Sequence, residues 1–132
     1  MEREVIRVEP ISTWVEAFKA PISVVVRHGD TVHVSGLPPF DPKTGAVLSG
    51  SIEEQTERVL EQLKQCLEAA GSSLALAIRC TVYCKSSAHY AAVNAIYARW
   101  FPKDPPVRVF VNVADWPGPF DIEIDCIAGR PD

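Results

Sequence analysis

The sequence predicts an α+β fold in a single domain, residues 1–132. Two segments, 51–71 and 86–101, carry apolar residues at the 3.6-residue spacing of amphipathic helices. About six other segments alternate apolar and polar residues with the period of two that strands show. In chain order these elements read β, ββ, α, β, α, β, β. Because two helices cannot cover both faces of such a sheet, we expect both helices to lie on one face.

The first 20 residues predict a short strand at 4–9 and then an irregular lead-in, with Trp14 and Phe18 as anchors onto the core. Residues 22–36 alternate on either side of the turn "HGD", where Gly29 tolerates a positive φ, and so predict a hairpin. Residues 37–45 contain three prolines and a glycine, which predict a loop.

Residues 51–71 form the clearest helix. Ser51 followed three residues later by Glu54 is a capping-box pattern, and Gly71 is placed to end the helix. A second helix, 86–101, begins at Ser86 or Ser87, and "PKDPP" ends it. Its expected buried stripe consists of Ala91, Val93, Asn94, Tyr97, Trp100 and Phe101.

Three further strands are predicted at 77–85, 107–114 and 121–128. Alternation assigns one set of side chains to the face beneath the helices: Ile78, Cys80, Val82, Cys84, Val107, Val109, Val111, Val113, Ile122, Ile124, Cys126 and Ala128. The other face receives Thr81, Tyr83, Arg108, Phe110, Asn112, Glu123, Asp125 and Ile127. This mixture of aromatic, apolar and ionisable groups is typical of a surface that meets a partner subunit or a ligand.

Arg108 stands among apolar neighbours in "PPVRVFV". A guanidinium is well suited to hold a carboxylate or phosphate through two hydrogen bonds. A solvated ion pair between Arg108 and Glu123 on an exposed sheet face is an equally good interpretation of the alternation.

Composition narrows the classes of function. Apolar residues make up 47% of the chain and charged residues 23%, and the net charge is −4, as in ordinary globular proteins. The 13 Lys and Arg residues form no run, which argues against a nucleic-acid partner. No apolar run approaches the roughly 18 residues of a membrane span. The charged first ten residues lack the apolar core of a signal peptide, so we expect a cytoplasmic protein.

The cysteines and histidines favour no metal site. Four cysteines lie in apolar segments without a C-x-x-C pair, which predicts buried thiols in a reducing compartment: Cys66, Cys80, Cys84 and Cys126. The three histidines share no spacing typical of metal ligands: His28, His33 and His89.

Four blocks of sequence, in order, resemble the RidA/YjgF family of reactive enamine and imine deaminases, often labelled the endoribonuclease L-PSP family. They are "VSGLPPFDPKTG", "EEQTERVLEQLKQCLEAAGSSL", "TVYCKSSAHYAAVNAIYARWF" and "PVRVFVNVADWPGPFDIEIDCIA". The resemblance runs from about residue 21 to residue 128, roughly four-fifths of the chain.

The resemblance implies a Bacillus chorismate-mutase-like subunit, with a six-stranded mixed sheet and two helices on one face. It also implies a homotrimer with active sites in the clefts between subunits. The last strand would be inserted between earlier strands, which places Arg108 and Glu123 on non-adjacent strands. Within one chain they would lie roughly 10 Å apart; alternatively, the glutamate comes from the adjacent subunit.

The implied activity is hydrolysis of 2-aminoacrylate or 2-iminobutyrate to a 2-keto acid and ammonia, with neither metal nor cofactor. Arg108 would bind the substrate carboxylate, and Glu123 would orient or activate the water. The backbone around Ser35 and Gly36 would line the pocket. Asn94 matches the family's helix asparagine, which makes either a helix–strand hydrogen bond or a substrate contact.

Three residues depart from the family pattern and predict a more aromatic pocket of different size. Ile22 stands where the family has tyrosine, Phe110 where it has cysteine, and Trp116 where it has an aliphatic residue. One alternative is therefore a deaminase of a bulkier unsaturated amino acid of the aminomuconate type. Another is a non-catalytic protein that binds small carboxylates or other proteins. The acidic charge and the lack of a histidine pair disfavour RNA cleavage, for which some family members are named.

Overall fold

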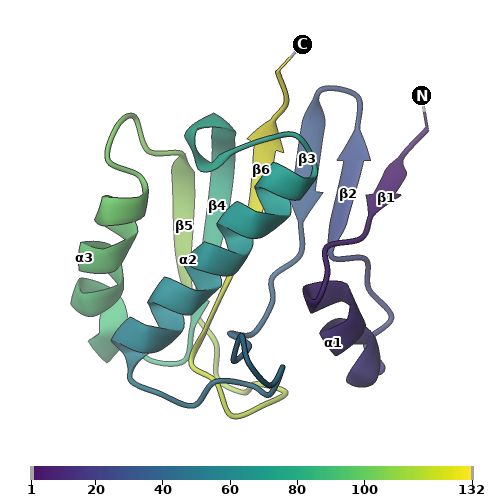
Figure 1. Cartoon of the computed structure of the whole chain (residues 1–132). Coiled ribbons are helices and arrows are strands. Elements are labelled where there is room, and N and C mark those ends of the chain that lie inside the picture. Colours follow the sequence, from purple (N-terminus) through teal and green to yellow (C-terminus); the bar gives the residue numbers. More distant parts are fainter. Residues whose placement is uncertain (1, 132) are drawn as a thin grey trace.

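The computed structural model of the chain describes residues 2–131 (Figure 1). Its helices and strands, in chain order, are β1 (Glu4–Ile6), α1 (Ile11–Ala17), β2 (Val25–His28), β3 (Thr31–Val34), α2 (Ile52–Ala69), β4 (Ala77–Cys84), α3 (Tyr90–Trp100), β5 (Val107–Asn112) and β6 (Ile122–Gly129). Single turns of 3-10 helix, η1 (Leu74–Leu76) and η2 (Ser87–His89), precede β4 and α3.

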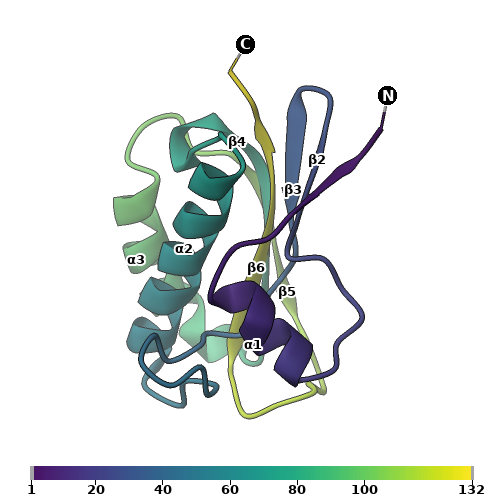
Figure 2. The same cartoon turned by 45° about the vertical axis from the view of Figure 1, so that its right-hand side comes forward.

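The strands form one mixed sheet with the order β1-β2-β3-β6-β4-β5. The pair β4–β5 is parallel and the other neighbours are antiparallel. Helices α2 and α3 lie on one face, and the opposite face is uncovered by helices (Figures 1 and 2). The predicted α+β class, the six-stranded mixed sheet and the insertion of the last strand are confirmed.

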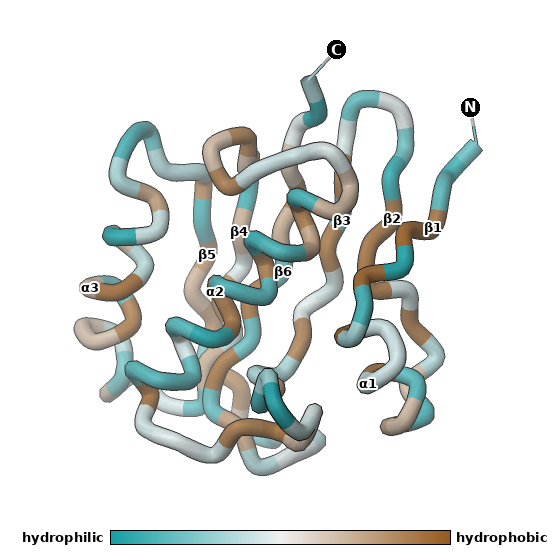
Figure 3. The backbone as a smooth tube through the Cα atoms, in the orientation of Figure 1, coloured by the Kyte–Doolittle hydropathy of each residue, from teal (hydrophilic) through white to brown (hydrophobic). Residues whose placement is uncertain are grey.

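Helix α2 begins and ends where its sequence predicts. The Glu54 N–H donates to the Ser51 hydroxyl at 3.1 Å, and Gly71 follows the helix with a φ of 81°. Its inner face buries Leu60, Leu63 and Leu67 almost completely against the sheet. Burial of one such side chain stabilises the fold by roughly 1.5–3 kcal/mol. Figure 3 shows hydrophilic residues on the side of α2 that is turned away from the sheet.

The predicted irregular lead-in is wrong, because residues 11–17 form α1. Ile11 and Val15 are one helical turn apart and both are buried, which supplies the apolar stripe that a short helix needs. Trp14 packs against Phe40, with ring centroids 5.6 Å apart, as an anchor should. Phe18 also stacks on Phe40 but remains 56% exposed, so it is a weaker anchor than predicted.

The faces predicted for β5 are also wrong. Cys80 of β4 pairs with both Arg108 and Cys126, and side chains paired across neighbouring strands share a face. Arg108 and Phe110 therefore lie on the helix-covered face. The β5 valines occupy the uncovered face, where Val107, Val109 and Val111 are 64%, 43% and 36% exposed. The prediction failed because alternation simply assigns the most apolar side chains of a strand to the core. It carries no information about the register between that strand and a distant one.

Two smaller predictions about burial fail for local reasons. The register between β4 and β6 is irregular between Ala77 and Arg79, which leaves Ile78 50% exposed instead of in line with Cys80. On α3, Ile96 is buried where Ala91 was expected, and Trp100 is only half-buried.

Candidate active site

Five of the eight predicted site residues line two separate hollows. The first, the arginine hollow, has a volume of about 280 Å³ and is lined by Asn94, Tyr97, Ala98, Phe101, Pro105, Pro106 and Arg108. The second, the glutamate hollow, has a volume of about 330 Å³. Its lining consists of Val15, Phe18, Ala20, Ile22, residues 36–38, Val47, residues 117–120 and Glu123.

Three aromatic rings surround the guanidinium of Arg108. Its Cζ atom lies 4.9 Å from the ring centroid of Tyr97, 5.7 Å from that of Phe110 and 5.8 Å from that of Tyr90. Cation–π contacts of this kind hold a cation in place without neutralising its charge. None of the ion pairs among residues 2–131 includes Arg108, so the predicted solvated pair with Glu123 is wrong. The guanidinium N–H groups are thus available to an external carboxylate.

Two buried polar atoms lie on α3 beside Arg108. Within the described part of the chain, the Oδ1 atom of Asn94 has no hydrogen-bond partner, and the hydroxyl of Tyr97 has none apart from the neighbouring Cys80 thiol. An unpaired buried polar atom costs roughly 1–3 kcal/mol, so this hollow is suited to a ligand with polar atoms. The helix–strand hydrogen bond considered for Asn94 is therefore not made by its Oδ1. Burial raises the pKa of Tyr97, which keeps its hydroxyl protonated.

Glu123 projects from the uncovered face of β6 into mostly apolar surroundings. Burial, followed by the nearby charge of Asp125, raises the pKa of the Glu123 carboxyl. A Cβ atom at Gly36 would lie only 2.9 Å from the Glu123 Oε1, so glycine at this position leaves room for the carboxylate. A half-buried carboxyl group with a raised pKa is suited to general acid–base chemistry.

Two of the departures from the family pattern, Ile22 and Phe110, lie near different hollows. Ile22 lines the glutamate hollow. Phe110 lies next to Arg108, and its ring makes a T-shaped contact with the Tyr90 ring at a centroid distance of 4.9 Å.

Trp116 lines neither hollow. Its indole N–H donates to the backbone carbonyl of Phe120, and the two rings are 4.6 Å apart. It therefore holds the turn 117–120, which forms one wall of the glutamate hollow.

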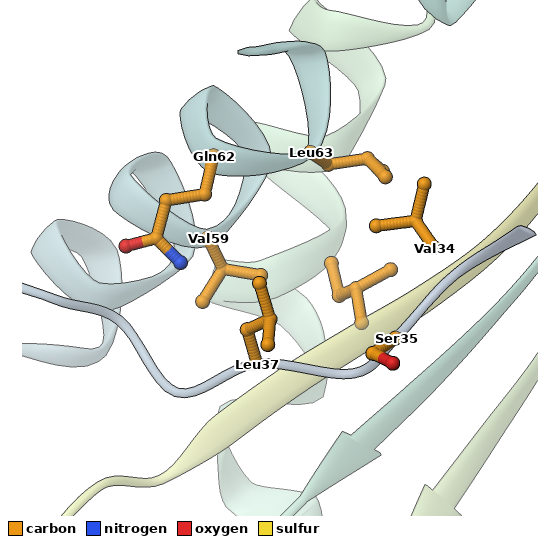
Figure 4. A pocket seen from close by; sticks show the side chains of 7 residues that line it. Val34, Ser35, Leu37, Val59, Gln62 and Leu63 are labelled. Atoms are coloured by element: carbon orange, nitrogen blue, oxygen red, sulfur yellow. The ribbon is translucent and has the colours of Figure 1, made fainter. Parts of the chain in front are cut away.

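Ser35 is occupied by structural hydrogen bonds. Its hydroxyl donates to the Ser23 carbonyl at 2.7 Å, and its backbone N–H donates to the Val24 carbonyl at 3.0 Å. It also borders an interior cavity of about 10 Å³ between α2 and the sheet, where Val59 faces Leu37 (Figure 4). Since that space holds at most one water molecule, it is part of the core and no ligand site.

Arg108 and Glu123 cannot meet within one chain. They lie on β5 and β6, which are separated by β4 as predicted, but their side chains are on opposite faces of the sheet. The prediction that both share a face about 10 Å apart is therefore wrong. A site that uses both residues requires two copies of the chain.

Tyr97 and Tyr90 are the residues at this site that sequence reasoning missed. The spacing of apolar residues assigns Tyr97 to the buried stripe of its helix, because an aromatic residue at that spacing is usually part of a core. The signal that could have found it is its position three residues after Asn94, since such residues share a helix face.

Residues 2–131 offer neither a metal-binding cluster nor a membrane-spanning helix. No group of three or more His, Cys, Asp or Glu side chains could hold a metal ion there. No helix in that range is both long and apolar enough to cross a membrane. All four cysteines are buried free thiols, as predicted.

Comparisons with known proteins place this architecture among described relatives. The sequence model of the family described as endoribonuclease L-PSP matches residues 15–129. A RutC family protein of Pyrococcus horikoshii is 43% identical over 108 residues, which cover 82% of this chain and 86% of that protein. The chloroplastic Reactive Intermediate Deaminase A of Arabidopsis thaliana is 36% identical over 108 residues, 82% of this chain and 58% of the relative. The crystal structure of E. coli TdcF with bound serine matches with a TM-score of 0.79 and 31% identity, and covers 85% of this chain and 90% of that one.

Proposed function

The chain belongs to the endoribonuclease L-PSP family, that is, the RidA/YjgF family, and on this premise we propose that it is a hydrolytic deaminase of 2-imino acids. Its substrates are 2-iminobutyrate and 2-aminoacrylate, the latter through its imine tautomer, and its products are a 2-keto acid and ammonia. One observation carries the proposal: an arginine without a carboxylate partner and a half-buried glutamate each line an open hollow.

The active site forms between subunits of a homotrimer, where Arg108 of one subunit faces Glu123 of the next. The exposed β5 valines support this assembly, because they alternate along one uncovered sheet face and an exposed apolar surface of this kind marks an interaction surface. A head-to-tail contact repeated by rotation closes into a ring, so each subunit contributes to two sites.

The arginine hollow binds the polar end of the substrate. Arg108 donates two hydrogen bonds to the substrate carboxylate, and the rings of Tyr97 and Phe110 keep the guanidinium in position. The Asn94 Oδ1 accepts from the substrate nitrogen or from an ordered water. The serine bound in the crystal structure of TdcF supports this arrangement, because serine bears its carboxylate and nitrogen on one carbon.

Glu123 performs the acid–base steps. Its carboxylate takes a proton from a water molecule, whose oxygen forms a bond to the imine carbon while the C=N electron pair moves to nitrogen. The protonated Glu123 then returns the proton to nitrogen. The hydroxyl proton of the resulting carbinolamine then passes through Glu123 to the same nitrogen, so that ammonia leaves as the C–N bond breaks and the former O–H electron pair forms the second bond of the keto group. Because the imine carbon is already electrophilic, positioning of the water supplies much of the rate.

The alternatives are less well supported. An aminomuconate-type substrate carries a second carboxylate, yet Arg108 is the one cationic side chain in the two linings. A non-catalytic carboxylate binder would need only Arg108 and would not place a carboxyl group with a raised pKa in the second hollow.

The test follows keto-acid release from 2-iminobutyrate, which threonine dehydratase generates in situ. The wild type should accelerate release, and Arg108→Ala and Glu123→Gln should each reduce the acceleration at least about 100-fold. Arg130→Ala, which removes an exposed arginine outside both linings, serves as the matched control and should retain activity. A wild type without acceleration would disprove the deaminase, and full activity in Glu123→Gln would disprove the role of Glu123.

A further inference from the structure

The glutamate hollow is much larger than the small imines need. Its volume is about 330 Å³, whereas a methyl group takes on the order of 30 Å³, similar to a water molecule in the liquid. Apart from Glu123, its lining contains no ionisable side chain. Its lining includes Phe18 and Ile22, which are 56% and 47% exposed, together with the buried Leu37 and Phe120.

The two hollows suit opposite ends of a substrate. The arginine hollow contains the guanidinium of Arg108, so it suits the carboxylate. The carboxylate and the side chain of an imino acid are attached to the same carbon, the one that Glu123 must reach. With the carboxylate on Arg108 of one subunit, the side chain extends into the glutamate hollow of the next.

We infer that this chain prefers imino acids with a branched or aromatic apolar side chain, which fills the glutamate hollow. The inference rests on the proposed function and names the substrate class of the same site. The reaction is unchanged: water adds, ammonia leaves, and the product is the corresponding 2-keto acid. Each methylene group that enters an apolar hollow is worth about a fourfold gain in binding, so side chains of four or more carbons should be strongly favoured.

The first experiment compares imines that differ only in the side chain. An L-amino-acid oxidase generates them from alanine, leucine and phenylalanine, with catalase present to remove peroxide, and keto-acid release is followed. We expect kcat/KM for the leucine and phenylalanine imines to exceed that for the alanine imine by at least about 10-fold. Equal or falling values along the series would overturn the inference and leave the deaminase intact. No acceleration with any imine would overturn both.

The second experiment reduces the space available. Val47 is half-buried in the lining, and Val47→Phe should fill part of the hollow. The ratio of kcat/KM for the leucine imine to that for the alanine imine should fall at least about 10-fold. Because both substrates are measured on one preparation, a partly unfolded variant does not change the ratio. Ala46→Phe is the matched control, since Ala46 is exposed and outside the lining, and it should keep the wild-type ratio. An unchanged ratio in Val47→Phe would contradict the inference.

Discussion

In the folded chain, the surroundings of the Glu123 carboxyl group disfavour its charged form. Burial and the neighbouring Asp125 both raise its pKa, so the folded chain holds this proton more tightly than the unfolded chain does. The stabilisation that comes from the protonated form is complete at low pH and is lost as the pH rises through the raised pKa. Above the raised pKa, the charged carboxylate therefore destabilises the fold relative to the protonated form.

Replacement of Glu123 by glutamine should consequently separate stability from activity. We expect Glu123→Gln to raise the free energy of unfolding by up to about 1 kcal/mol at pH 7. The gain should disappear below about pH 4, where the wild-type carboxyl is protonated in both states. Urea unfolding at the two pH values measures this difference. A less stable variant at pH 7 would mean that the charge of Glu123 stabilises the fold.

Gly36 has no side chain, and the space that a Cβ atom would fill is taken by the Glu123 carboxylate. Gly36→Ala places a Cβ atom 2.9 Å from the Glu123 Oε1 and forces the carboxylate to move. Displacement of a catalytic group by about 1 Å can cost up to 100-fold in rate, so we expect kcat to fall 10- to 100-fold. Gly129→Ala is the matched control, since a Cβ there meets its nearest atom at an ordinary 3.7 Å. Equal kinetics for the two variants would contradict the placement of Glu123.

At the scale of elements, α2 packs on the core and also holds the loops around the candidate site through side-chain hydrogen bonds. Its inner face buries three long polar residues, Gln55, Arg58 and Gln62, in addition to its apolar stripe. Gln62 accepts from the Phe40 N–H at 2.7 Å and donates to the Pro38 carbonyl at 3.0 Å. Arg58 donates to the Phe40 carbonyl at 2.6 Å. These bonds hold the loop after β3, which includes one wall of the glutamate hollow.

Gln55 holds the entry to β6 in the same way. It accepts from the Asp121 N–H at 2.8 Å and donates to the Asp121 carboxylate at 2.9 Å, two residues before Glu123. Gln55→Ala should cost about 1–3 kcal/mol of unfolding free energy, because it leaves buried groups unpaired. Gln65→Ala on the same helix loses one exposed bond and should change stability by less than about 0.5 kcal/mol. Similar values from denaturant unfolding would contradict the connecting role of Gln55.

Local patterns explain which elements could be predicted. The caps of α2 depend on Ser51, Glu54 and Gly71, which act within one helical turn and are visible in the sequence. The faces of β5 depend on the pairing of Cys80 with Arg108, which lie 28 positions apart, and alternation within a strand cannot determine such a register. The sequence could therefore suggest Arg108 and Glu123 as candidate site residues, but it could not predict their placement on opposite faces of the sheet.

At the scale of the whole molecule, one chain presents two hollows, which in the proposed function are the two halves of one site. The arginine hollow lies on the helix-covered side of β5, and Glu123 lies on the uncovered face of β6. The apolar valines of β5 lie exposed between them in the single chain. All three features are accounted for if neighbouring subunits cover the valines and bring the two halves together.

Mixing two inactive variants tests this shared site most directly. Arg108→Ala subunits retain Glu123, and Glu123→Gln subunits retain Arg108, so a ring that contains both types has intact sites at some of its interfaces. Equal amounts, unfolded and refolded together, should recover about a quarter of the wild-type activity on 2-iminobutyrate, as random assembly of a closed ring requires. Each variant refolded alone should remain inactive. If the mixture is as inactive as its components, Arg108 and Glu123 do not complete one site across the subunit boundary.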